Sequence, residues 1–274
     1  MSTQAEKGRT FRALHQRNSA FIIPNPWDVG TARLLAGLGF EALATTSAGH
    51  AFSAGKRDNM IDRPDAIGHG SAIASATNLP VSADLENGFG DAPEIAAETI
   101  RLAAAAGLVG GSIEDMSRQP GHSIYEHELA AERVRAAAEA AHALPFPFTL
   151  TARAENYLVG RPDLGDTIKR LQAYQTAGAD VLYAPGLTSR DDIAAVVRSV
   201  DRPVNVVMGL QGVQLTLAEL SAIGVRRVSI GSALARAALG AFLRAAREMR
   251  EHGTFAFAED AVSYRDINSM FDAP

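Results

Sequence analysis

The feature that most constrains this chain is a regular alternation of two kinds of segment. Short apolar runs of β-strand length alternate with longer, alanine-rich amphipathic stretches that have helical periodicity. The expected strands cover residues 21–23, 42–45, 81–84, 109–113, 148–152, 181–183, 204–207 and 228–230. The expected helices cover residues 29–38, 64–77, 93–106, 126–142, 163–177, 189–199, 216–223 and 232–251. Eight strand–helix units predict an α/β fold of the (β/α)8 TIM-barrel type, and a doubly wound open sheet is the alternative.

The composition limits the number of domains and the kinds of site. The chain has 274 residues, of which 47% are hydrophobic, and no linker or break in composition divides it. We therefore expect a single barrel domain over residues 1–274. Its last part, from about residue 255 to 274, is expected to form a helical extension that packs on the barrel or on a neighbouring subunit. The chain contains no cysteine, which excludes disulfides, thiolate metal sites and thiol nucleophiles.

Charge and hydropathy indicate which partners to expect. The formal net charge is −5 and no basic stripe is present, so we expect no nucleic-acid binding. No stretch reaches the roughly 18 consecutive apolar residues of a membrane span. The N-terminal segment is charged and lacks the apolar centre of a signal peptide. These features predict a cytoplasmic protein that binds no membrane.

Carboxylates gather where the predicted strands end, which is where barrel enzymes carry their active sites. Asp84 ends one strand, Glu86 follows two residues later, Glu114 follows the next strand, and Asp58 lies in the loop after residues 42–45. In an extended chain, residues two apart point to the same face, so Asp84 and Glu86 should point to one place. A hard divalent cation removes the repulsion among such groups, and oxygen ligands favour Mg²⁺ or Mn²⁺ over zinc. The alternative is that Asp84 and Glu86 form ion pairs or helix caps.

Arg153 ends an otherwise apolar strand close to this predicted metal site. A guanidinium there can bind a substrate carboxylate or phosphonate through two parallel hydrogen bonds. The alternative is a structural salt bridge to Glu155 or Glu114, and the two roles are compatible. Asp115 is expected to cap a helix or form a salt bridge rather than to bind a metal.

The polar loop after the fourth predicted strand reads MSRQPGHSIYEHEL and is a candidate lid over the mouth of the barrel. Within it, Arg118 and His122 are candidate acid–base or anion-binding groups, and a solvated His122 is the alternative. Five further histidines fall on helical or terminal segments and are expected at the surface, namely His15, His69, His127, His142 and His252.

The loops after the last two predicted strands indicate a second kind of site. They contain the segments VNVVMGLQG and VSIGSALA, and Gly231 and Ser232 stand where many barrels bind phosphate. The alternative, which we favour, is that these two residues only begin the last helix. A phosphate site leaves the carboxylate cluster unexplained.

Taken in order, these motifs resemble the isocitrate lyase/phosphoenolpyruvate mutase superfamily. The similarity runs over nearly the whole chain, from PNPWDVGTARLLAGLGFEALATTSAG through ADLENGFGD, GGSIED and TARAENYLVG to AYQTAGADVLYAPG. The most specific parts are the carboxylate-x-carboxylate-x-Gly-aromatic-Gly pattern and the IED motif. The resemblance implies a Mg²⁺-dependent enzyme that acts on a 2-oxo or 2-hydroxy acid. Such enzymes pass through an enolate while a C–C or P–C bond is cleaved or formed.

The resemblance also assigns roles to residues. On the metal positions of the superfamily stand Asp58, Asp84, Glu86 and Glu114, and on the position of its substrate-anion arginine stands Arg153. Ser47, Ala48 and Gly49 match the segment that binds the oxo-acid end of the substrate with a side chain and backbone amides. The resemblance further implies a homotetramer in which the last barrel helix, residues 232–251, is exchanged between neighbouring subunits.

Two specificity signatures of the superfamily are missing. Isocitrate and methylisocitrate lyases carry Lys-Lys/Arg-Cys-Gly-His in the loop after the fourth strand, whereas this chain has RQPGH and no cysteine to donate a proton. Phosphonomutases carry a lysine and an asparagine in that loop, which are not evident here, and a histidine where this chain has Pro185. Glu86 also stands where the superfamily commonly has aspartate.

These features together predict a Mg²⁺-dependent carbon–carbon lyase or decarboxylase for a substrate of the oxaloacetate or substituted-malate type. P–C bond chemistry on a phosphonate, of the phosphonomutase or phosphonopyruvate hydrolase type, is the first alternative. A phosphate-binding barrel enzyme and a non-catalytic member of the family are the others.

Overall fold

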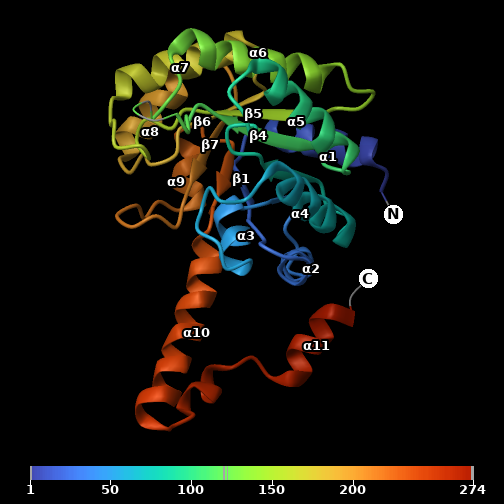
Figure 1. Ribbon diagram of the computed structural model, residues 1–274, viewed down its shortest axis with the longest axis vertical. Coiled ribbons are helices and arrows are strands. Elements are labelled where there is room, and N and C mark those ends of the chain that lie inside the picture. Colours follow the sequence, from blue (N-terminus) through green and yellow to red (C-terminus); the bar gives the residue numbers. More distant parts are fainter. Residues whose placement is uncertain (1, 120, 122, 273–274) are drawn as a thin grey trace.

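The computed structural model describes residues 2–119, 121 and 123–272 of the chain. The prediction for His122 therefore lies outside the described residues. Within them, eight parallel strands alternate with helices and form a nearly closed barrel, which confirms the predicted fold (Figure 1).

The strands form one sheet in the order β1-β8-β7-β6-β5-β4-β3-β2. They are β1 (Phe21–Ile23), β2 (Leu43–Ala44), β3 (Val81–Asp84), β4 (Gly110–Glu114), β5 (Thr149–Arg153), β6 (Val181–Tyr183), β7 (Val204–Val207) and β8 (Arg227–Ser229). The Ala44 N–H donates to the Pro24 carbonyl at 3.1 Å, which links β2 to the end of β1 and brings the two edges together. Each predicted strand is present, with ends shifted by at most one or two residues.

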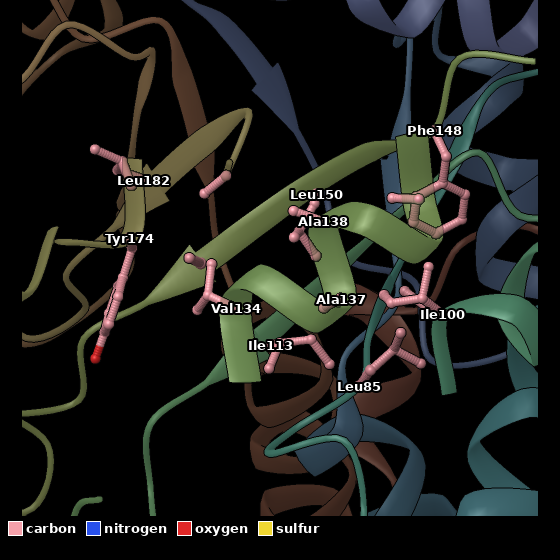
Figure 2. Close-up of a cluster of buried hydrophobic side chains, with 14 of the residues drawn as sticks. Leu85, Ile100, Ile113, Val134, Ala137, Ala138, Phe148, Leu150, Tyr174 and Leu182 are labelled. Atoms are coloured by element: carbon pink, nitrogen blue, oxygen red, sulfur yellow. The ribbon is translucent and has the colours of Figure 1, made fainter. Parts of the chain in front are cut away.

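Helices surround the barrel on its outside (Figure 1). The eight predicted helices correspond to α2 (Val29–Gly37), α4 (Arg63–Ala76), α5 (Pro93–Ala105), α6 (His127–His142), α7 (Leu164–Thr176), α8 (Arg190–Arg198), α9 (Leu217–Ala222) and α10 (Ala233–His252). Side chains of α5, α6 and α7 pack against the outer faces of the strands. Figure 2 shows Val134 and Ala138 of α6 in one cluster with Ile113 of β4 and Leu150 of β5.

Two further helices, α1 (Gln4–His15) and α3 (Ser47–Ser53), were not predicted from the sequence. The side chain of Thr3 accepts a hydrogen bond from the Glu6 N–H and Glu6 reciprocates, a capping box that starts α1. Phe11 and Leu14 then lie three residues apart on one face of the helix and are buried. His15 is also buried, at 5% exposure, so the expectation of a surface position was wrong for this residue.

The end of the chain leaves the barrel. Helix α10 points away from it, and α11 (Tyr264–Asp272), preceded by the 3-10 helix η1 (Ala256–Asp260), returns towards α2 (Figure 1). Arg33 of α2 donates a hydrogen bond to the Phe271 carbonyl at 2.6 Å and lies over the Phe271 ring. The chain is thus helical over 256–260 and 264–272, and α11 contacts α2 of the barrel. In the described part of the chain, no helix is long and apolar enough to cross a membrane.

Candidate active site

A cavity of about 200 Å³ opens at the carboxyl ends of the strands. Of the predicted site residues, five line it, namely Ser47, Ala48, Asp58, Asp84 and Arg153. These residues come from three separate strand–loop junctions, so the fold brings them together as the strand-end argument predicts. Glu86 and Glu114 are buried beside them.

Asp84 is the carboxylate that the site holds most tightly. Its Oδ2 accepts from the Ser47 hydroxyl at 2.8 Å and from the Ser47 N–H at 3.3 Å, and its Oδ1 accepts from Arg153 Nη1 at 2.9 Å. The Asp84 N–H donates to Thr45 Oγ1 at 2.9 Å. These contacts fix one carboxylate at the wall of the cavity, between β2 and β5. Thr45 was not among the predicted site residues.

Arg153 holds the acidic side chains in place. Its Nη1, Nη2 and Nε lie 2.9, 3.1 and 2.8 Å from oxygens of Asp84, Glu114 and Glu155. Burial disfavours the charge of this guanidinium, but the three carboxylates outweigh burial and hold its pKa above the ordinary value. Burial likewise raises the pKa of Glu114 and of Glu155, while Arg153 opposes that rise. The salt bridges named as an alternative are thus present.

Glu86 reaches the site by a different route from the one predicted. Its φ angle is 48°, in the left-handed region, so the chain turns here and is no longer an extended strand. The residue is 2% exposed, and its Oε2 pairs with Arg118 from the loop after β4. The other oxygen, Oε1, is buried and has no hydrogen-bond partner among the residues that the structure describes. Burial, and then the negative charge of Asp84, raise the pKa of Glu86 to about 7.

Asp58 and Gly49 differ in how they face the cavity. Asp58 lies at the cavity mouth, and its pKa is raised by loss of surrounding water and by the charge of Asp84. Gly49 is buried, and its N–H donates to the side chain of Thr46, the N-cap of α3. An added Cβ on Gly49 stands 2.6 Å from Thr46 Cγ2 and 3.1 Å from Trp27 Cβ. This glycine therefore allows close packing under Ser47 and Ala48, and its amide is already used.

The donor set fits a hard divalent cation. Asp84 presents carboxylate oxygens at the cavity wall, Glu86 adds its buried Oε1, and the nearby acidic groups supply oxygen only. Among the residues that the structure describes, however, no three histidine, aspartate or glutamate side chains form a ready ligand set. Arg153 stands between the carboxylates instead. The oxygen donors of Asp84 and Glu86 are therefore the groups here that would hold such a cation.

Behind the site, Asp115 belongs to a buried network. It accepts from the Tyr174 hydroxyl at 2.6 Å, from Arg170 Nη1 at 3.0 Å and from the Glu155 N–H at 2.8 Å. Its predicted role in a salt bridge is therefore confirmed. Through the Glu155 N–H, the network fixes the turn after β5, next to Arg153.

Further polar residues that the sequence analysis did not select also line the cavity. Asn205 of β7 and Arg227 and Ser229 of β8 line it, together with Asn25 after β1. The available signal was the presence of polar side chains inside short strands. In a barrel, alternate residues of a strand point inwards, and polar ones among them are candidates for a site.

The chain was compared with known protein families, proteins and structures. The model of the family described as phosphoenolpyruvate phosphomutase matches residues 11–250. The chain belongs to this family. The isocitrate lyase/phosphoenolpyruvate mutase superfamily inferred from the motifs is therefore confirmed, and the protein is an enzyme of the carbon–carbon lyase class found in that superfamily.

Three relatives illustrate how this family member relates to others. A crystal structure from Burkholderia cenocepacia J2315, described as a candidate lyase or mutase, is 67% identical with a TM-score of 0.97, over 99% of this chain and 97% of that one. An uncharacterized protein of Mycobacterium tuberculosis is 34% identical over 88% of this chain and 89% of its own length. The oxaloacetate decarboxylase of Pseudomonas savastanoi pv. phaseolicola is 30% identical over 89% and 84%, respectively.

Proposed function

We propose that the protein is a Mg²⁺-dependent lyase (Mn²⁺ being the other suitable ion) for a 2-oxo or 2-hydroxy dicarboxylic acid. The reaction is C–C cleavage or decarboxylation through an enolate, with a substrate of the oxaloacetate or substituted-malate type. The observation that carries this proposal is Asp84, fixed at the cavity wall by Ser47 and Arg153 and flanked by buried carboxylates. The kinship with oxaloacetate decarboxylase supports this substrate class.

In this proposal, one set of side chains holds the cation and another binds the substrate. Asp84, Glu86, Glu114 and Asp58 are the residues that would hold the cation. The cation, when bound, supplies Lewis-acid stabilisation of the negative charge that develops on the substrate's 2-oxygen. The Ser47 hydroxyl and the Ser47 and Ala48 amides contact the oxo-acid end of the substrate, and Gly49 lets this segment approach closely.

Arg153 and the polar groups at the cavity mouth have the remaining roles in the proposed reaction. Arg153 keeps the carboxylates in position and adds positive charge beside the reacting acid. Asp58, whose pKa is raised, and His122 of the lid loop are the candidate proton-transfer groups. Arg118, which pairs with Glu86, ties that loop to the metal site.

The test is a substrate panel with and without Mg²⁺. Oxaloacetate, substituted malates, methylisocitrate and phosphonopyruvate are each incubated with the enzyme, and the release of pyruvate or CO₂ and the formation of phosphoenolpyruvate are measured. Activity on a dicarboxylic acid that stops with EDTA and returns with Mg²⁺ supports the proposal. Asp84→Ala should abolish turnover while Asp201→Asn, at an exposed position, retains it. Activity that is unaffected by EDTA contradicts the proposal.

P–C bond chemistry on a phosphonate is the second candidate, because the matching family model is that of a phosphomutase. Turnover of phosphonopyruvate but of no dicarboxylic acid in the same panel establishes it. A phosphate-binding enzyme has less support. The amides of Ile230 and Gly231 both donate to Asn25 Oδ1, at 2.9 and 3.0 Å, so they are not free for a phosphate. Mg²⁺ and oxalate failing to bind in calorimetry contradicts the proposed Mg²⁺-dependent reaction.

We also propose a cytoplasmic homotetramer in which α10 is exchanged between subunits. The structure describes all 20 residues of this helix, and among them Ala235 is buried, whereas Leu239, Phe242, Leu243 and Met249 are exposed apolar residues. Covering such a face by a neighbouring subunit removes apolar surface from water. Light scattering after size-exclusion chromatography tests this: a tetramer mass supports the proposal and a monomer mass contradicts it.

A further inference from the structure

Arg227 on β8 is a buried arginine of the active-site cavity. The residue is 5% exposed and lines the cavity. Its Nε donates to Asn205 Oδ1 at 2.9 Å, and its Nη2 donates to Thr151 Oγ1 at 3.0 Å. These two partners are neutral, so they satisfy hydrogen-bond donors without balancing the positive charge.

The third partner, His15 of α1, is neutral as well. His15 Nδ1 lies 2.8 Å from the Phe11 carbonyl, which only accepts, so Nδ1 carries the hydrogen. The other ring nitrogen, Nε2, is then free to accept from Arg227 Nη1 at 3.4 Å. Burial, followed by the charge of Arg227, lowers the pKa of His15 to about 3. The histidine therefore adds no charge at neutral pH.

Arg227 thus differs from Arg153 in what faces its nitrogen atoms. Each Arg153 nitrogen faces a protein carboxylate, whereas no salt bridge to Arg227 is found within the described residues. Burial lowers the pKa of Arg227 to about 10, which still leaves it charged at neutral pH. An unpaired buried charge is costly, so a partner anion is expected in some state of the protein. Arg153 has already been neutralised by its neighbours and is less suited to that anion.

The space next to Arg227 suits a small anion. Ser82, Ser112 and Ser229 line the same cavity, where barrel interiors are usually filled by bulky branched side chains. These small polar residues leave room and offer further hydrogen-bond donors. The guanidinium itself has more N–H groups than its three contacts use.

We infer that Arg227 binds the second carboxylate of the substrate, within the same cavity that Asp84 and Ser47 line. This inference rests on the proposed function, because that function places the oxo-acid end at Asp84 and Ser47. It assigns specificity for a dicarboxylic acid to Arg227, with Asn205 holding the guanidinium through the contact to Nε. Arg153 keeps its proposed role at the oxo-acid end of the substrate, where it positions the carboxylates and adds positive charge.

Two pairs of reagents test the inference. The ligand pair is malate and 2-hydroxybutyrate, which share a 2-hydroxy acid head and differ in that a methyl group replaces the second carboxylate. The variant pair is Arg227→Gln and Arg226→Gln, adjacent positions on one chain segment. Arg226 donates to the Gly224 carbonyl and is outside the set of cavity residues, so it is the matched control. Affinities are measured by calorimetry with Mg²⁺ present, and oxalate reports on the oxo-acid end alone.

We expect the native enzyme and Arg226→Gln to prefer malate over 2-hydroxybutyrate by about tenfold or more, the effect of one charge-assisted hydrogen bond. Arg227→Gln should lose most of this preference while binding oxalate within about threefold of the native enzyme. Arg227→Lys, which keeps the charge, should retain part of it. Equal preference in Arg227→Gln and Arg226→Gln overturns the inference and leaves the proposed function intact.

The remaining outcomes also distinguish failure of the proposed function from failure of the inference on Arg227. If the native enzyme does not bind oxalate with Mg²⁺, the proposed function fails. In that case, malate binding that depends on Arg227 still supports an anion site at this arginine. If malate does not bind either, the inference on Arg227 is overturned. Circular dichroism and thermal melting identify a misfolded variant. If Arg227→Gln is misfolded, the comparison of Arg227→Lys with Arg226→Lys decides in its place: a reduced malate preference supports the inference and an unchanged one overturns it.

Discussion

Replacing Asp115 by alanine should destabilise the protein more than any surface change of similar size. Asp115 is 3% exposed and accepts three hydrogen bonds, from Tyr174, from Arg170 and from the Glu155 N–H. Alanine leaves all three donors without this acceptor in a buried space. Removing one partner of a buried ion pair costs about 3–5 kcal/mol.

The size of the loss does not come from the charge of Asp115 itself. Burial raises its pKa above the ordinary value, and its hydrogen bonds only partly offset that rise. The cost instead comes from the groups left behind, chiefly the buried Arg170 guanidinium and the Tyr174 hydroxyl. In a chain of this size, about 4 kcal/mol lowers the melting temperature by about 10 °C. Asp115→Asn, which keeps one acceptor oxygen, should lose less.

Urea unfolding followed by circular dichroism measures the effect. Glu41→Ala is the matched control, because Glu41 pairs with Arg17 on the surface, where both side chains are about half exposed. That control should cost less than about 1 kcal/mol. If Asp115→Ala lowers the free energy of unfolding by less than about 1 kcal/mol, the reasoning that this hydrogen-bond network stabilises the turn after β5 is refuted.

Three further predictions follow from single contacts. Burial, and then the charge of Arg227, lower the pKa of His15 from its ordinary value of 6.5 to about 3, so the free energy of unfolding should fall as pH drops from 6.5 towards 3. His15→Gln should reduce that slope by about 1.4 kcal/mol per pH unit in urea titrations, and an unchanged slope contradicts this. Gly49→Ala should cost about 1–3 kcal/mol through its contact with Thr46, whereas Gly68→Ala, in open space on α4, should be neutral or stabilising. Ser47→Ala removes the 2.8 Å hydrogen bond to Asp84, and Mg²⁺ affinity in calorimetry should drop; equal affinity argues against Ser47 as a support of the proposed metal site.

The fold was predictable because periodicity reports directly on burial. Each of the eight strands and their helices produces its own alternation of apolar residues, and the order of elements then implies the barrel. Helix α3 was missed because seven residues after a strand, beginning at Ser47, give too short a pattern to distinguish from a loop. Helix α1 was missed because its exposed face is highly charged and only Phe11, Leu14 and their neighbours are buried.

The site residues were predictable where a side chain lies at the end of a strand. They were less predictable where the register of a strand or the geometry of a turn determines which way the side chain points. Asp84 and Arg153 lie in strands whose ends the apolar pattern marks. Glu86 reaches Asp84 by a turn with positive φ, which the two-residue periodicity of a strand does not describe. Arg226 and Arg227 are adjacent, and only the register of β8 decides which of them points into the barrel.

The most direct test of the account is a crystal structure with Mn²⁺ and oxalate, using the anomalous signal of manganese to locate the cation. The account predicts one anomalous peak in the cavity, within about 2.2 Å of an Asp84 oxygen, with oxalate between it and Ser47. Glu86 and Glu114 should lie beside it. A peak away from Asp84, or none at a saturating Mn²⁺ concentration, contradicts the central claim that this carboxylate holds the catalytic metal.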